Sequence, residues 1–217
     1  TTEIYTLSLH DALPISGERW LITGPNGCGK TTLLSLITGD NPAGYANVVR
    51  IFGQSRQEGQ SVWQIRRRIG HVSPEMQAYA DETMTVLDCA LSALYSESGT
   101  LLTPRAPHRQ QARSWLTRFG LADALRKPMS ELSAGHQRLV FLARALVAHP
   151  DLLILDELCM NLDEAARQNV LHTVEALARQ RPELTMLCVA HRADDVPSGF
   201  THHLALGNMS ATRSRTR

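Results

Sequence analysis

Residues 24–32, G-P-N-G-C-G-K-T-T, have the residue types and the spacing to bind a polyphosphate. Gly24, Gly29, Lys30 and Thr31 fit the pattern G-x-x-x-x-G-K-S/T. Glycines let the backbone turn tightly and approach a ligand, so that successive N–H groups can point into one concavity. Lys30 would reach the β- and γ-phosphates, and the Thr31 hydroxyl would ligate Mg²⁺. We therefore predict a phosphate-binding loop at this position.

A loop of this kind lies between a strand and a helix, and the flanking residues predict both. Residues 19–23 are apolar and β-prone, while residues 32–38 carry leucine and isoleucine at helical spacing, and Gly39 can end that helix. This context weakens the alternative, a glycine-rich turn that binds nothing. The candidate ligand-binding residues are Gly24, Pro25, Asn26, Gly27, Cys28, Gly29, Lys30, Thr31 and Thr32.

Two adjacent acids, Asp156 and Glu157, form a second candidate site after the apolar run 152–155. Continuous apolar runs are typical of strands that are buried on both faces of a parallel sheet, and the carboxyl ends of such strands face the ligand crevice. Asp156 is predicted to hold Mg²⁺, and Glu157 to orient or deprotonate the attacking water. An ordinary strand whose acids begin the next loop is the alternative, and the upstream phosphate loop makes it the weaker one.

The segment L-S-A-G-H-Q-R, residues 132–138, lies between these two sites and precedes a helical pattern. Ser133 is a good helix N-cap, and the apolar residues that follow form a stripe with helical spacing. By itself this pattern indicates only a capped amphipathic helix. The stripe consists of Leu139, Phe141, Leu142, Leu146 and Val147.

The order of these segments, followed by N-L-D at 161–163 and a histidine after the apolar run 184–190, resembles the ABC ATPase family. The resemblance implies a head-to-tail pair of cassettes, in which Ser133 and the N–H groups near Gly135 bind the γ-phosphate of the partner's ATP. It places Asp163 at the seam of that pair and makes His191 the switch histidine that senses the γ-phosphate. The implied cofactors are ATP and Mg²⁺. The implied catalytic residues are Lys30, Glu157 and His191, and the implied metal ligands are Thr31 and Asp156.

The chain departs from the family pattern in the signature segment and after the acids. Ala134 replaces the first glycine of L-S-G-G-Q, and His136 replaces its glutamine. Leu158 stands where most members have proline, which affects the stiffness of the loop rather than its chemistry. The contact that the glutamine makes in the family is therefore left open for His136.

A further departure concerns the glutamine that follows a strand in the family, where it contacts the metal or water. Here the strand is expected at residues 69–72, and S-P-E-M follows it. Gln77 lies close to the expected position but is displaced. Three alternatives are open: Glu75 makes the contact of the family glutamine, Gln77 makes it, or neither residue does.

A closer resemblance is to the ModF-like group, cytosolic tandem-cassette ATPases that are linked by name to molybdate transport or photorepair. It rests on residues 33–47, on Phe52-Gly53, on V-W-Q-I at 62–65 and on the strand I-G-H-V-S. The match best suits the second cassette of that group and runs from about Gly17 to about Leu206.

The implied fold class is α/β, a P-loop NTPase of the ABC type with a mostly parallel sheet and an inserted helical subdomain. Residues 17–206 would form the ATPase domain, with its core from 17–74 and 150–206 and its helices from 75–149. Pro104 and Pro107 are predicted to separate the first inserted helix from the second. Residues 207–217 are predicted to be a tail with a frayed, solvated end.

The first sixteen residues do not fit the family pattern, although a cassette has strands and an adenine-stacking aromatic residue before its phosphate loop. T-L-S-L-H-D-A-L-P-I-S resembles a translated sequencing adapter, and the family resemblance starts abruptly at Gly17. We therefore expect residues 1–16 to be a non-native segment and assign Tyr5 no adenine role. A divergent strand is the alternative.

The composition limits which partners and which cellular location are expected for the protein. A net charge of +1 indicates no general nucleic-acid binder. The densest apolar run is far too short for the roughly 20 residues of a membrane span, so any transmembrane transporter subunit would be a separate chain. Four scattered cysteines without metal spacing indicate reduced thiols, and hence a cytoplasmic protein, free or peripheral at the inner face of the membrane.

Three functions remain open at this point. The first is an ATP-hydrolysing cassette that works with a second cassette, in tandem or as a homodimer, and is coupled to transport. The second is a nucleotide-gated regulator without catalysis, favoured by His136 and the irregular glutamine segment. The third is an ABC protein of DNA repair or translation, although only about a hundred residues separate Lys30 from Ser133, too few for the long coiled-coil insertion of repair proteins.

Overall fold

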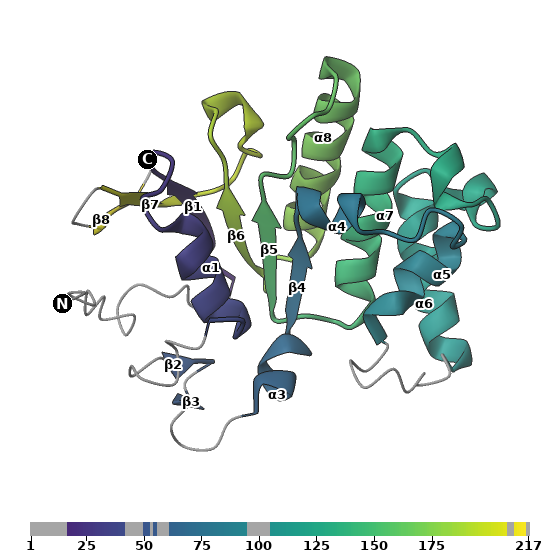
Figure 1. The fold of residues 1–217 in the computed structure, drawn as a ribbon, viewed down its shortest axis with the longest axis horizontal. Helices are drawn as coiled ribbons and strands as arrows, with labels where there is room; N and C mark the ends of the chain where they lie inside the picture. Colours follow the sequence, from purple (N-terminus) through teal and green to yellow (C-terminus); the bar gives the residue numbers. More distant parts are fainter. Residues whose placement is uncertain are drawn as a thin grey trace.

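A six-stranded sheet forms the centre of the computed structural model, which describes residues 17–41, 50–52, 54–55, 61–94, 105–207 and 211–215 (Figure 1). Its order is β4-β5-β6-β1-β7-β8. The first five of these strands are parallel, and β8 pairs antiparallel with β7. The strands are β1 (Arg19–Thr23), β4 (Ile69–Val72), β5 (Leu152–Asp156), β6 (Thr185–Val189), β7 (His202–Leu206) and β8 (Ala211–Arg215). A separate antiparallel pair consists of β2 (Arg50–Ile51) and β3 (Gln54–Ser55).

Helices cover both faces of this sheet. One face carries α1 (Lys30–Thr38), and the other carries α7 (Ala134–Val147) and α8 (Glu164–Gln180). The remaining α-helices are α3 (Val62–Arg66), α4 (Pro74–Ala78), α5 (Val86–Leu91) and α6 (Ala106–Arg118). Short 3₁₀ turns are η2 (Ser92–Leu94), η3 (Ala122–Ala124), η4 (Met129–Glu131) and η5 (Ala193–Asp195).

The apolar run of β5 is buried on both faces, as a central parallel strand requires. Leu152 and Ile154 join the apolar cluster with α1, while Leu153 and Leu155 join the larger cluster with α5 to α8. This alternation fixes the register of the strand, because a slip of one residue would exchange the two sets of side chains. The predicted α/β fold with a mostly parallel sheet is confirmed.

The inserted helices α5, α6 and α7 pack together to one side of β4 (Figure 1). The contact between α7 and the sheet is close at Gly70, where a Cβ atom would lie 2.7 Å from the Ala145 carbonyl oxygen. Glycine at this position therefore lets the helix carrying the L-S-A-G-H-Q-R segment rest directly on β4. Among the residues described, no helix has the length and apolar character needed to cross a bilayer.

Two expectations about local structure are wrong. Residues 211–215 are not frayed, because they add β8 to the edge of the sheet beside β7. Pro107 does not lie between two helices, because α6 already begins at Ala106. A proline in the first helical turn is well tolerated, since the N–H that it lacks would have no partner within the helix there. Pro104, Gly53 and residues 1–16 and 42–49 lie outside the described part of the chain.

Candidate functional site

The predicted phosphate loop connects β1 to the N-terminus of α1, as expected. Gly29 is the N-cap of α1 at φ 99°, and Gly27 has φ 77°, both in the left-handed region that favours glycine. The cap has no side chain to accept a bond from the first turn of the helix, and that turn contains no acid. The positive end of the helix dipole thus faces the loop without a protein anion to neutralise it, which suits a phosphate group.

Gly24, where the loop leaves β1, is held in a close approach. A Cβ atom there would lie 2.5 Å from Cys28 Sγ and 2.5 Å from the Leu206 carbonyl oxygen. Leu206 is the last residue of β7, so the loop rests on the end of the neighbouring strand. The half-buried Cys28 thiol therefore fills space under the loop.

Lys30 is buried, and its ammonium group lies inside the loop. Its Nζ atom donates to the Gly24 carbonyl at 2.7 Å and to the Pro25 carbonyl at 3.0 Å. Thr31 and Thr32, in the first turn of α1, are exposed beside it, as are Pro25, Asn26 and Gly27 on the outer side of the loop. A buried cation with an exposed helix N-terminus matches the donor set that a triphosphate needs.

Asp156 and Glu157 lie at the carboxyl end of β5, and His191 lies just beyond the end of the adjacent strand β6. The pairing of Asp156 with Val189 aligns the two strand ends. Glu157 Oε1 is 2.6 Å from His191 Nε2. Residues 34 positions apart in the sequence thus meet in one carboxylate–imidazole pair. Glu157 has φ 46°, which few non-glycine residues adopt, so the strain falls at this residue.

Burial, helped by the nearby carboxylates of Glu157 and Glu75, raises the pKa of Asp156 to about 6, although His191 and Lys30 oppose the shift. A buried carboxylate among other acids gains from a divalent cation, which replaces the lost solvation. Within the described residues no three His, Cys, Asp or Glu side chains are grouped to hold a metal. A Mg²⁺ ion held by Thr31 and Asp156 would therefore need phosphate and water for its other ligands, which Mg²⁺ prefers.

Ser133, Gly135 and Asp163 come together at the N-termini of α7 and α8. Ser133 is the predicted N-cap, and its Oγ accepts from the His136 N–H at 3.3 Å. Asp163 caps α8 by accepting from the Ala166 N–H at 2.8 Å. The hydrogen bonds of the described residues do not join this group to the phosphate loop. Ser133, His136 and Asp163 are exposed, so the group is open to a partner.

The family model described as ABC transporter matches residues 15–160. The chain belongs to this family. The ABC transporter ATP-binding protein ModF of Escherichia coli (strain K12) is 41% identical over 192 residues, which are 87% of this chain and 38% of ModF. The uncharacterized ABC transporter ATP-binding protein C323.04 of Schizosaccharomyces pombe is 35% identical over 198 residues, 88% of this chain and 39% of that protein. The chain thus spans about two fifths of the length of these two relatives.

Solved structures of ABC cassettes share the fold. A nucleotide-free ATP-binding cassette from an ABC transporter has a TM-score of 0.78 at 22% identity, covering 94% of this chain and 82% of that one. CbiO1 from Clostridium perfringens, part of the ABC transporter complex CbiONQ, has a TM-score of 0.75 at 22% identity, covering 92% and 78%. The fold expected from the resemblance is therefore found.

In this ABC cassette Gly135 has a packing role of its own. A Cβ atom at Gly135 would lie 2.7 Å from the Cβ of Ala166 on α8. We predict that Gly135→Ala lowers the free energy of unfolding by about 1–3 kcal/mol, because α7 and α8 must separate. Urea unfolding measures the loss. Adding Ala166→Gly should cost less than the sum of the two single changes, and strict additivity would contradict the contact.

Asp156 gives the cassette a pH-dependent stability. Its folded pKa of about 6 exceeds the unfolded value of 3.8, so the folded state binds the proton more tightly and stability falls as pH rises between these values. Without a divalent cation at pH 7.5, we expect Asp156→Asn to raise the free energy of unfolding by about 1–2 kcal/mol, after a discount for partial exposure.

That gain should shrink toward pH 4.5, and urea unfolding in EDTA at both pH values measures it. Asp151→Asn is the matched control, since Asp151 is an exposed acid beside the opposite end of β5 and pairs with Arg68. An equal gain at both pH values, or an equal gain in the control, would show that Asp156 does not titrate as described.

The displaced glutamine is hydrogen-bonded to the helix that carries the L-S-A-G-H-Q-R segment. Gln77 lies in α4, where its Nε2 donates to Gln137 Oε1 at 2.6 Å and its Oε1 accepts from Arg138 at 3.3 Å. Both ends of its amide are therefore bound to α7. Glu75 remains near the acids, since it raises the pKa of Asp156.

Arg138 escaped prediction because the helical pattern predicts only apolar core positions. A charged residue directly before the apolar stripe that begins at Leu139 is expected to lie on the solvated surface of the helix. Its side chain is instead among the most deeply buried in the described structure. The one signal available in the sequence is its position next to an apolar stripe.

Proposed function

We propose that this ABC cassette hydrolyses ATP with Mg²⁺ and does so against a second cassette. The observation that carries the proposal is the 2.6 Å contact between Glu157 and His191, beside Asp156. A carboxylate held by an imidazole at the strand ends beside a phosphate loop is in a position to activate water. A cassette that only binds nucleotide has no need of this pair.

The phosphate loop and Lys30 bind the β- and γ-phosphates, with the N–H groups at the N-terminus of α1 facing them. Thr31 and Asp156 would hold a Mg²⁺ ion, whose charge would neutralise the phosphates. Glu157 orients a water molecule and accepts its proton. His191 keeps that carboxylate in place and faces the γ-phosphate. Pro25, Asn26, Gly27 and Thr32 shape the exposed rim of the loop.

The second cassette completes the site. Ser133 and Asp163 are exposed at two neighbouring helix N-termini, with the buried Gly135 directly behind them, and this arrangement suits a phosphate arriving from outside the chain. A relative in which this chain corresponds to only 38% of the length has room for a second cassette in the same polypeptide. We propose a tandem pair of the ModF-like kind, with this chain as its second cassette, or otherwise a homodimer.

The process coupled to hydrolysis is transport through a separate membrane subunit, with the cassette on the cytoplasmic side. Molybdate is suggested by the name of the group alone. Release of phosphate from Mg-ATP, measured against protein concentration, tests the core of the proposal. A rate that rises faster than linearly with concentration supports a homodimer, and no turnover at any concentration in a preparation with both cassettes contradicts hydrolysis.

A non-catalytic, nucleotide-gated regulator is the second candidate. It is favoured by Gln77, whose amide is bound at both ends to α7, and by His136 in place of the signature glutamine. Binding of ATP without turnover in a preparation with both cassettes would support this candidate.

A further inference from the structure

Arg138 on α7 is a buried cation with few partners. Only 2% of its surface is exposed, and its Nε and Nη1 atoms have no hydrogen-bond partner among the described residues. Burial lowers its pKa. Replacing buried charges with apolar residues of similar volume is often neutral or stabilising, so stability alone does not explain an arginine here.

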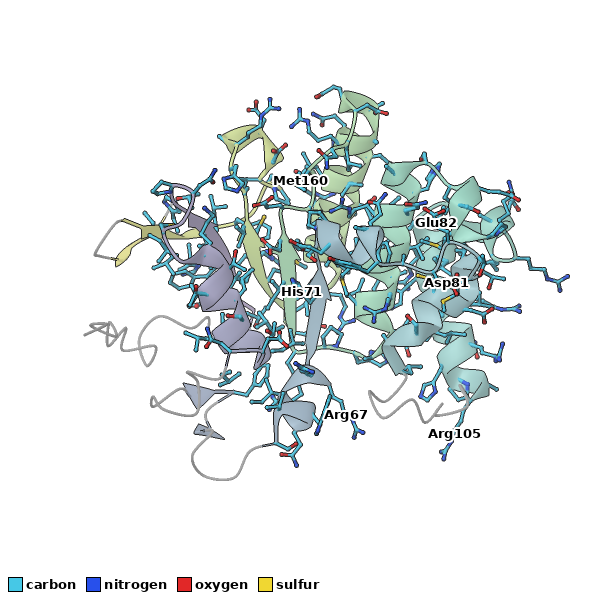
Figure 2. All side chains as sticks on the ribbon, in the orientation of Figure 1. Arg67, His71, Asp81, Glu82, Arg105 and Met160 are labelled. Atoms are coloured by element: carbon cyan, nitrogen blue, oxygen red, sulfur yellow. The ribbon has the colours of Figure 1, made fainter. Side chains whose placement is uncertain are left out.

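The contacts of Arg138 join three segments. Its Nη2 donates to Gln77 Oε1 of α4 at 3.3 Å and to the Met160 carbonyl oxygen at 3.4 Å. Met160 belongs to the loop 157–163, which carries Glu157 at one end and Asp163 at the other. Figure 2 shows Met160 at the edge of the sheet where β5 and β6 end.

The peptide group after Met160 is one turn away from the strained backbone at Glu157. The Met160 N–H donates to the Glu157 carbonyl at 2.9 Å and closes that turn. The Met160 carbonyl, on the other side of the residue, is the acceptor for Arg138. A non-glycine residue at φ 46° persists only where the surroundings hold it, and Arg138 supplies a bond to the same turn.

We propose that Arg138 is a positioning residue, which aligns the loop 157–163 with α4 and α7 so that Glu157 keeps its place beside His191. The proposal rests on the proposed hydrolysis of ATP by this cassette. It assigns no contact with nucleotide to Arg138. The positioning depends on both acceptors, Gln77 Oε1 and the Met160 carbonyl oxygen, because the same guanidinium nitrogen donates to α4 and to the loop.

Arg138→Met in the full chain tests the role, because methionine fills much of the volume without charge. We expect a free energy of unfolding equal to or above that of the wild type, affinity for an ATP analogue within about twofold, and kcat lowered about tenfold or more with KM unchanged. A purely structural residue would instead lower the free energy of unfolding when replaced, or change KM and kcat together.

Arg144→Met is the matched control on the same helix. Arg144 is a second arginine on α7 whose pKa burial lowers, but its Nε donates to Ser92 Oγ at 2.8 Å within the helical region. Its replacement should leave kcat per folded molecule unchanged. A loss of kcat equal to that of Arg138→Met would overturn the proposal, and so would wild-type kcat in Arg138→Met.

Two further measurements cover the remaining outcomes. If Arg138→Met does not fold, Arg138→Lys tests the proposal, because lysine keeps the charge but replaces the forked guanidinium donor with a single nitrogen. Wild-type kcat in Arg138→Lys would overturn the proposal. Hydrogen exchange of the Met160 amide does not depend on turnover. It should be at least about tenfold faster in the Arg138 variant than in the Arg144 variant. Absence of hydrolysis by the wild type counts against the proposed function, while unchanged exchange counts against the role of Arg138.

Discussion

Glu157→Gln should lower kcat for ATP hydrolysis at least about 100-fold while leaving ATP affinity nearly unchanged. A positioned general base contributes about 10²–10⁴ to rate, and glutamine keeps the shape of glutamate but cannot accept the proton. The side chain is hydrogen-bonded to His191, and no hydrogen bond of the described residues joins it to residues 24–32, so binding should survive. Single-turnover hydrolysis, together with titration of a fluorescent ATP analogue, separates the two effects.

The same variant should accumulate the paired, ATP-bound state, which size-exclusion chromatography with Mg-ATP detects as a larger species. Glu183→Gln is the matched control, because it makes the same chemical change beside the opposite end of β6, at a residue that pairs with Arg181. The control should keep its wild-type rate. Hydrolysis by Glu157→Gln at the wild-type rate would show that Glu157 is not the base.

The sequence allowed prediction of the parts of the site that depend on local backbone. Each of these parts is encoded by residues that are close together in the sequence. They are the glycines of the phosphate loop, the Ser133 cap before its helix, and the apolar run that ends at Asp156. The parallel sheet then brings Asp156 and His191 to one edge, because the carboxyl ends of adjacent parallel strands coincide. Residues far apart in the sequence could therefore be placed together.

The features that the sequence did not predict depend on side-chain packing between helices and strands. Whether Gln77 faces the nucleotide or α7 is decided by Gln137 and Arg138, which lie about sixty residues further along the chain. Likewise, the close contact of Gly135 with Ala166 depends on how α7 and α8 cross. β8 pairs with β7 at the edge of the sheet, although the polar, arginine-rich sequence of residues 211–215 does not predict a strand. Helix and strand periodicity contain no information on these contacts.

Lys30→Ala should weaken ATP binding at least about 100-fold, which corresponds to about 2.7 kcal/mol. The ammonium group already lies inside the loop, where it donates to the Gly24 and Pro25 carbonyls, so a bound triphosphate would receive a desolvated cation. Charge-assisted bonds to phosphate in such a place are worth more than neutral ones. Alanine removes both the charge and the two bonds that shape the loop.

Isothermal titration with Mg-ATP measures this loss, and unfolding in urea without nucleotide checks that the fold survives. Lys127→Ala is the matched control, because Lys127 is the other lysine of the sequence and is exposed in the helical region. It should bind ATP as the wild type does. If Lys30→Ala binds within about threefold of the wild type, the loop does not hold the phosphates through this lysine. The same loss in Lys127→Ala would instead indicate a general effect of net charge, which the burial of Lys30 argues against.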